Sequence, residues 1–177
     1  MLAEWNLHYE DWIIGDGEPD RRIGDVFDWF ALGFWSEETL EKVNESGRSA
    51  VPVADFRYRV VAEVLYISQD ACIIDFGLNA TGLKVTATDD VLPSDCKKGD
   101  FVMGEIGLRL PLVTEVGPEE EFKKLAYRWR VNRISADLTP YVNSRRDESR
   151  IHYQDVPATA SVKAQCDILH CCNVSPE

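Results

Sequence analysis

RYRVVAEVLYISQDACIIDFGL, residues 57–78, is the stretch that decides the fold class of this chain. One face of its first half carries apolar or small side chains at every second position: Tyr58, Val60, Ala62, Val64 and Tyr66. This period of two, with many β-branched and aromatic residues, is typical of a β-strand. The polar triplet Ser68-Gln69-Asp70 then supplies a turn, and residues 71–76 resume as an apolar run. The stretch therefore predicts a β-hairpin.

The same periodicity extends the prediction to the rest of the chain. We expect further strands at residues 25–35, 83–87, 101–110, 125–134, 150–154 and 161–170, with turn-forming residues between them. Regular short strands of this kind predict an all-β fold class, with mainly antiparallel strands in a small barrel or sandwich of OB or SH3-like character. We expect at most one short helix, near residues 37–46, with Ser36 as its N-cap.

A local repeat supports this interpretation. Gly24-Asp25 and Gly99-Asp100 each precede an apolar alternating run. Glycine can adopt a tight backbone geometry, and aspartate can accept hydrogen bonds from its own turn. Each pair is therefore expected to start a strand.

The length of 177 residues predicts a single domain, with an acidic, aromatic-rich part at 1–50 and the main β core at 51–177. The net charge is −12, which does not favour binding to duplex DNA. Residues 1–50 hold 12 acids and 4 bases (net −8), whereas residues 122–150 hold 8 bases and 3 acids (net +5). The opposite charges of these two segments either compensate each other in the fold or form a surface with one acidic and one basic side for a charged partner.

The sequence predicts a cytoplasmic protein without a membrane partner. No segment approaches the roughly 18 apolar residues of a membrane span. The first residues also lack the basic and apolar regions of a signal peptide. In the cytoplasm the five cysteines would be reduced.

Asp75-Phe76-Gly77 matches the triplet with which protein kinases bind magnesium. None of the three histidines is followed by Arg-Asp, there is no glycine-rich loop, and Lys42 is the one lysine that precedes Asp75. Without these partners the triplet does not indicate phosphoryl transfer. We expect Asp75 to face solvent or a hydrogen-bond donor at the end of its strand.

Two further patterns suggest metal sites at first sight. Residues 16–27 place acids at the first positions of a calcium loop, but Arg21 and Phe27 stand where that loop needs glycine and glutamate. Cys166, Cys171 and Cys172 lie near His170, yet no C-x-x-C pair exists in the chain. We therefore predict no metal site and no cofactor, and the sequence assigns no catalytic residue.

The best binding candidate is the strand that contains Arg128, Arg130 and Arg133. If Tyr127 and Trp129 point into the core, the first two arginines form a cationic stripe outside. After Val131 the apolar phase slips, which predicts a bulge near Asn132. Trp12 and Trp35 are additional candidates, as tryptophans in exposed loops.

From these features we expect a non-catalytic binding protein whose partner is a protein, plausibly a basic one. Inhibitors that neutralise basic enzymes, such as toxin-immunity proteins, offer an analogy for the acidic surface. One alternative is an OB-like module that binds single-stranded nucleic acid through the three arginines. A further alternative is an enzyme with a carboxylate site that carries no recognisable motif.

Overall fold

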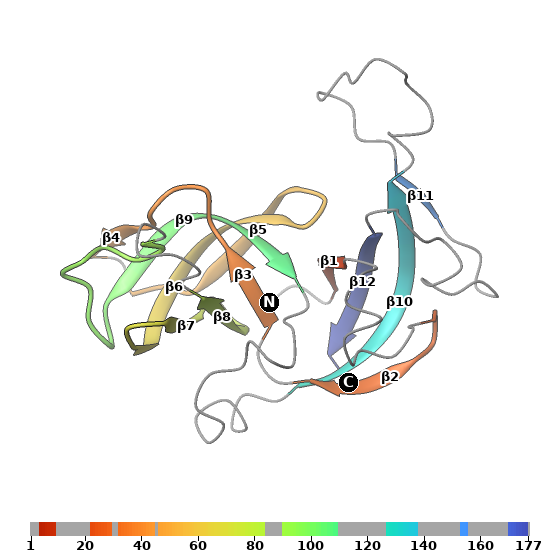
Figure 1. Ribbon diagram of the computed structural model, residues 1–177, viewed down its shortest axis with the longest axis horizontal. Helices are drawn as coiled ribbons and strands as arrows, with labels where there is room; N and C mark the ends of the chain where they lie inside the picture. Colours follow the sequence, from red (N-terminus) through yellow and green to blue (C-terminus); the bar gives the residue numbers. More distant parts are fainter. Residues whose placement is uncertain are drawn as a thin grey trace, which may run out of the picture.

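The computed structural model describes residues 4–9, 22–29, 32–44, 46–83, 90–109, 127–137, 153–155 and 170–176 (Figure 1). These residues form twelve strands and no helix. The strands are β1 (Trp5–Tyr9), β2 (Val26–Trp29), β3 (Leu32–Trp35), β4 (Glu41–Val43), β5 (Ser49–Ala54), β6 (Arg57–Ile67), β7 (Ala71–Asp75), β8 (Asn79–Leu83), β9 (Phe101–Arg109), β10 (Tyr127–Asp137), β11 (Tyr153–Asp155) and β12 (His170–Pro176). The predicted all-β fold class is confirmed.

Five of these strands close into a mixed barrel. β6 pairs antiparallel with β7, and β7 with β8. β8 then runs parallel to β3, and the circle closes through β9 back to β6. β4 and β5 extend this barrel at the edges of β9 and β6. We call β3–β9 the first unit.

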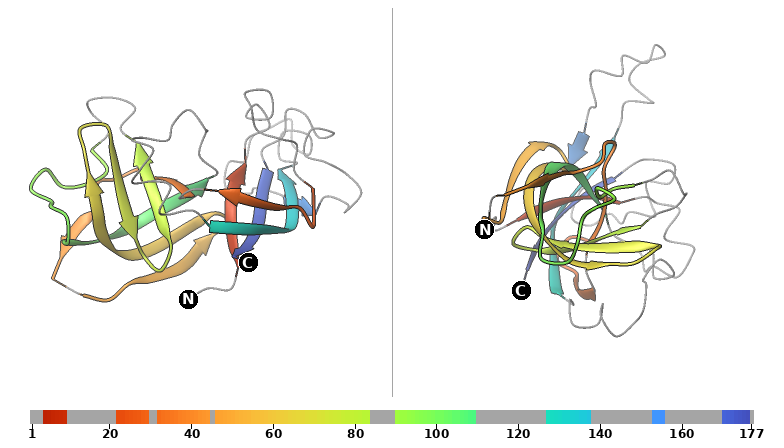
Figure 2. Two further views of the ribbon diagram at one scale, coloured as in Figure 1. Left: turned by 90° about the horizontal axis from the view of Figure 1, so that it is seen from below. Right: turned by 90° about the vertical axis from the view of Figure 1, so that its left-hand side faces the viewer.

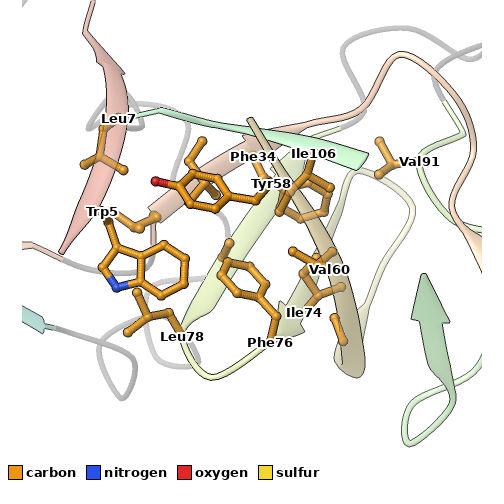
Figure 3. Close-up of a cluster of buried hydrophobic side chains, with 14 of the residues drawn as sticks. Trp5, Leu7, Phe34, Tyr58, Val60, Ile74, Phe76, Leu78, Val91 and Ile106 are labelled. Atoms are coloured by element: carbon orange, nitrogen blue, oxygen red, sulfur yellow. The ribbon is translucent and has the colours of Figure 1, made fainter. Parts of the chain in front are cut away.

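The hairpin predicted from residues 57–78 forms the centre of the first unit. Tyr58, Val60, Ala62 and Val64 are buried, as their alternation predicts. Figure 3 shows the resulting core, in which Trp5 from β1 packs beside Tyr58 and Phe76 at ring-centroid distances of 5.2 and 5.6 Å. The core of the barrel thus continues into β1, which contributes Trp5 and Leu7.

The remaining strands β1, β2, β10, β11 and β12 form a second unit beside the first (Figure 2). β10 is its long central strand, with β12 along one edge and, on the other edge, β2 beside its first half and β11 beside its end. β12 pairs in turn with β1. The pair His8–Arg109, between β1 and β9, continues the sheet into the first unit.

The two Gly-Asp pairs predicted to start strands form the same corner in the two units. Gly24 and Gly99 have φ angles of 92° and 91°, a region that favours glycine. The Asp25 carboxylate accepts a hydrogen bond from the backbone N–H of Arg22 at 2.8 Å. The Asp100 carboxylate does the same for Lys97, also at 2.8 Å. β2 and β9 begin directly after these corners, so the prediction is confirmed.

The correspondence extends across both units. In each, the corner exchanges two backbone hydrogen bonds with one valine of the long strand, and a bulge follows that valine. From each corner a line of residues, each paired with the next on the neighbouring strand, runs across the unit. In the first unit this line contains Asp100, Val64, Ile74 and Ala80. The corresponding line in the second unit contains Asp25, Val131, Val174 and Trp5. The strands β6, β7, β8 and β9 of the first unit therefore correspond to β10, β12, β1 and β2 of the second. The first set follows the order of the chain, whereas the second set follows it only after a circular permutation.

Some predicted boundaries need correction. The helix considered for 37–46 is not formed, because residues 41–43 instead pair with β9 as strand β4. Of the strand predicted at 83–87 only Leu83 lies within the described residues, as the last residue of β8. β8 itself follows β7 closely, because Gly77 has a φ of 107° where the chain reverses. The strand predicted at 150–154 is described over 153–155, and the one predicted at 161–170 falls outside the described residues except for His170.

Candidate functional site

A concave surface of the described structure lies along one edge of β9. β4 pairs with the start of β9, at residues 101–103, and β3 pairs with its end, at residues 107–109. Between these two contacts residues 36–40 leave the sheet and arch over β9. We call this segment the arch.

Two glycines of β9 let the arch lie close to the strand. A Cβ atom at Gly107 would lie 2.3 Å from the Trp35 ring, and one at Gly104 would lie 2.5 Å from Cδ2 of Leu40. The arch is also tied by hydrogen bonds. The Ser36 hydroxyl lies 2.8 Å from the carbonyl oxygen of Glu105, and the Thr39 hydroxyl donates to the carbonyl of Asp90 at 2.8 Å. The arch is therefore a fixed wall.

Between the arch, β4, β6 and β9 lies a groove of about 410 Å³. Its lining carries four carboxylates and two guanidinium groups: Glu37, Glu38, Glu41, Glu105, Arg57 and Arg59. Trp35 and Met103 contribute apolar surface to the same groove, which the buried side chains of Leu40 and Ile106 also line. The groove is therefore acidic on balance, with an apolar component beside the charges.

Arg57 holds the two sides of this groove together. Its guanidinium pairs with Glu105 on β9 at 3.1 Å and with Glu37 on the arch. This leaves Glu38 and Glu41, both exposed, as the carboxylates of the groove outside that cluster. The exposed Arg59, opposite Glu105 on β6, also lines the groove, so two glutamates face one arginine outside the cluster.

A second cavity, of about 230 Å³, lies between β7, β8 and residues 90–96. Cys72 and Cys96 both line it, together with apolar side chains such as Val91 and Leu92. Burial raises the pKa of the Cys96 thiol, and the nearby Asp100 carboxylate raises that pKa further. A thiol of this kind is a poor nucleophile at neutral pH. The cavity therefore lacks an activated cysteine at Cys96.

Asp75 has structural partners in the fold. Its carboxylate accepts a hydrogen bond from the backbone N–H of Gly77 at 2.8 Å and pairs with Arg48 at 2.9 Å. The same arginine also binds Glu63, the residue opposite Asp75 on β6. The expected hydrogen-bond donor for Asp75 is therefore present, and these contacts stabilise the end of the hairpin.

The predicted arginine strand is β10. Trp129 is fully buried, whereas Arg128, Arg130 and Arg133 are exposed. The bulge expected near Asn132 is present between Val131 and Arg133. Because the bulge adds one residue, it reverses the alternation, so that Arg133 faces the side of Arg128 and Arg130 while Ile134 is buried. We call these three residues the arginine row.

The structure separates the other predicted site residues from this row. Trp35 does not lie in an exposed loop, as predicted, but at the end of β3, where it is half-buried against His8 and Phe56. Trp12 lies outside the described residues. The groove could not be recognised in the sequence, because its lining comes from three separate segments and one of them, within residues 37–46, has the pattern of a short helix. The one available signal was the pair Gly104 and Gly107 within a strand.

Comparison with protein-family models, with curated protein sequences and with solved structures gave no match. Within the described ranges no three histidine, cysteine or acidic side chains converge as metal ligands. Since these ranges form no helix, they also contain no helical segment suited to crossing a bilayer.

Proposed function

We propose that the protein is a non-catalytic binding protein whose acidic groove takes a basic segment of a protein partner. The observation that supports this most is the lining of the groove, where four glutamates outnumber two arginines. Glu38 and Glu41 are exposed and stand outside the Arg57 cluster. Carboxylates placed this way attract arginine or lysine and steer the approach of a basic partner.

The apolar part of the groove adds contact area to this charge. Trp35 and Met103 line it beside the glutamates, and both residue types are common at protein interfaces. The arch is held by hydrogen bonds from both ends, so little order has to be gained on binding. A rigid acidic groove of this kind suits an inhibitor that covers a basic surface of its target.

Binding of a fluorescent peptide of alternating arginine and glycine, measured by anisotropy at low ionic strength, tests the proposal. The variant E37Q/E38Q/E41Q keeps the size of each side chain and removes three charges. We expect it to bind the peptide roughly tenfold more weakly, as the loss of three exposed charges implies.

The matched control is E4Q/D55N/D70N, which removes three exposed carboxylates outside the groove. It should retain most of the affinity, because only the general field of the protein changes. Equal losses in the two variants would show that the peptide responds to net charge alone, and would reject the groove as the site.

A further inference from the structure

The second cavity lies at one end of the barrel core, where β6 ends, β7 begins and β8 ends. Cys72 of β7 is paired with Ile67 of β6 on one side and with Gly82 of β8 on the other, and all three line the cavity. Residues 90–96 form a further wall, and Val91 in this segment belongs to the same buried cluster as Cys72. Figure 3 shows Val91 at one edge of this cluster. The cavity therefore lies between the end of the barrel and the segment that covers it.

Small residues leave this space open. Ala71 and Cys72 begin β7, and Gly82, which pairs with Cys72, has no side chain. A Cβ atom at Gly82 would lie 2.6 Å from Cζ of Phe34 and 3.1 Å from Sγ of Cys72, so a larger residue there would displace the Phe34 ring. Protein interiors leave few voids larger than a water molecule. A space of about 230 Å³ thus follows from these residue types and exceeds an ordinary packing gap.

The wall formed by residues 90–96 is held in place by hydrogen bonds to its backbone. The carbonyl of Val91 accepts a hydrogen bond from the N–H of Leu40 at 2.9 Å. The carbonyl of Asp90 accepts one from the Thr39 hydroxyl at 2.8 Å. The cavity is therefore preformed, as ligand pockets usually are.

The lining of the cavity is mostly apolar, with the two thiols beside the side chains of Ile67, Ala71, Val91, Leu92 and Pro93. The Ser68 hydroxyl is already engaged, because it donates to the carbonyl of Ala71 at 3.1 Å and accepts from the N–H of the same residue at 3.0 Å. Ile67, which is 37% exposed, and the exposed Asp90 and Ser94 mark the mouth. Water needs two to four polar partners to be held in such a space. It is therefore held weakly between these side chains, and an apolar group displaces it with a gain in affinity.

The two thiols favour an aromatic ring as the occupant. Burial and the nearby Asp100 carboxylate raise the pKa of the Cys96 thiol, which therefore stays protonated and uncharged at neutral pH. Metal binding and disulfide exchange both need the thiolate. Neutral, polarisable sulfur instead makes favourable contacts with aromatic rings. The cavity thus suits a bound ring better than a metal ion or a covalent adduct.

We propose that this cavity binds a small neutral aromatic molecule of one or two fused rings. A dry cavity of about 150 Å³ already holds benzene. The larger volume here leaves room for a bicyclic ring such as that of indole. A charged group would find no compensating charge among the apolar walls, so charged ligands are excluded. Among the described residues none lines both this cavity and the groove, and the inference does not rest on the function proposed for the groove.

Titration of the isotope-labelled full chain with indole, followed by NMR, tests the proposal. We expect saturable shifts of the backbone amides around the cavity, at Cys72, Gly82 and Val91. Cys96→Phe and Ala71→Leu fill the cavity from two separate walls, and each should weaken binding by roughly tenfold or more. Ala54→Leu, at an exposed position outside the cavity, adds the same carbons as Ala71→Leu and should bind indole like the wild type.

An indole carboxylate tests the chemical class of the ligand. It keeps the two rings but adds a charge, and it should bind roughly tenfold or more weakly than indole. Equal affinity for the two compounds would overturn the assignment of a neutral ligand.

Two results would overturn the site itself. The first is the absence of saturable shifts around the cavity. The second is unchanged indole affinity in a filling variant that retains the native spectrum, because the ring would then lie elsewhere. Two filling variants are used, so that one which fails to fold leaves the other to decide. The arginine–glycine peptide does not enter this experiment, so its outcome and that of the proposed function are separate.

Discussion

The two units share one backbone frame but fill it with different side chains. In the first unit Ala62 and Ala80 occupy two positions of the closed barrel, and both are fully buried. Counting from the Gly-Asp corners, the corresponding positions in the second unit are Trp129 and Trp5. Both tryptophans are just as buried as the two alanines. Two small residues are thus matched by two of the largest.

The two units also differ in how each frame is closed. In the first unit β3 inserts between β8 and β9 and completes the barrel. In the second unit the described part of β2 pairs with β10, and β1 meets β9 through one residue pair. Trp5 packs across this junction onto Tyr58 and Phe76 of the barrel, in one core that also holds Trp129. Corner, bulge and register are thus retained in the two units, while the side chains at matching positions differ in size with their surroundings.

The largest effect is expected from truncating the buried tryptophan of the second unit. Trp129→Ala should lower the free energy of unfolding by about 3–5 kcal/mol, because it leaves a cavity that the sheet cannot close. Trp35→Ala, at a half-buried position, should cost clearly less. Urea denaturation of both variants measures this order, and a smaller loss for Trp129→Ala would contradict the assignment of Trp129 to a packed core.

A medium effect is expected at the two corners. A Cβ atom at Gly24 or Gly99 would meet no neighbour within 4 Å, so alanine there is opposed by backbone conformation alone. Gly24→Ala and Gly99→Ala should each cost about 1–2 kcal/mol, the usual strain of a left-handed residue. Similar losses in thermal unfolding would support the equivalence of the corners, whereas a loss at only one of them would break it. Gly47→Ala, also in open space but without a positive φ, is the control.

The smallest effect distinguishes the corners by pH. The hydrogen bond from Lys42 lowers the pKa of Asp100 below its ordinary value of 3.8. The stabilisation from this carboxylate is therefore fully present above pH 3.8 and is lost as the pH falls through the lowered pKa. We expect Asp100→Asn to be slightly less stable than the wild type at pH 7 and to converge with it in acid.

Asp70→Asn, at an exposed turn carboxylate, should follow the wild type throughout and serves as the control. Asp25→Asn should lose less at pH 7 than Asp100→Asn, because asparagine can still accept the hydrogen bond from the Arg22 backbone N–H, whereas Asp100→Asn also loses the ion pair with Lys42. A stability difference for Asp100→Asn that stays constant with pH would show that the Lys42 contact does not contribute.

Local chemistry explains which features could be predicted from the sequence. The hairpin at 57–78, the Gly-Asp corners and the bulge near Asn132 depend on neighbouring residues, whose alternation and turn chemistry are visible in the chain. The arch was mistaken for a helix because Ser36 and two glutamates imitate a helix start. The segment forms a strand because Glu41 pairs with Met103, which lies far from it in the sequence.

The groove and the pairing of β12 with β1 belong to the part that could not be predicted. Both depend on segments far apart in the sequence, and no local pattern records which strands will become neighbours. The three residues of the arginine row were visible as candidates in the sequence, and the structure brings them to one side of β10.

The pairing of β1 with β12 also sets an order of events during synthesis. All five strands of the barrel lie between Leu32 and Arg109, so the barrel can close before β10 is made. β1, although produced first among the described strands, has to wait for a partner that is produced last. Trp5 can already pack on Tyr58 and Phe76 of the barrel, but until β12 is made the edge of β1 that pairs with it stays open to wrong strand pairing while the chain is still incomplete.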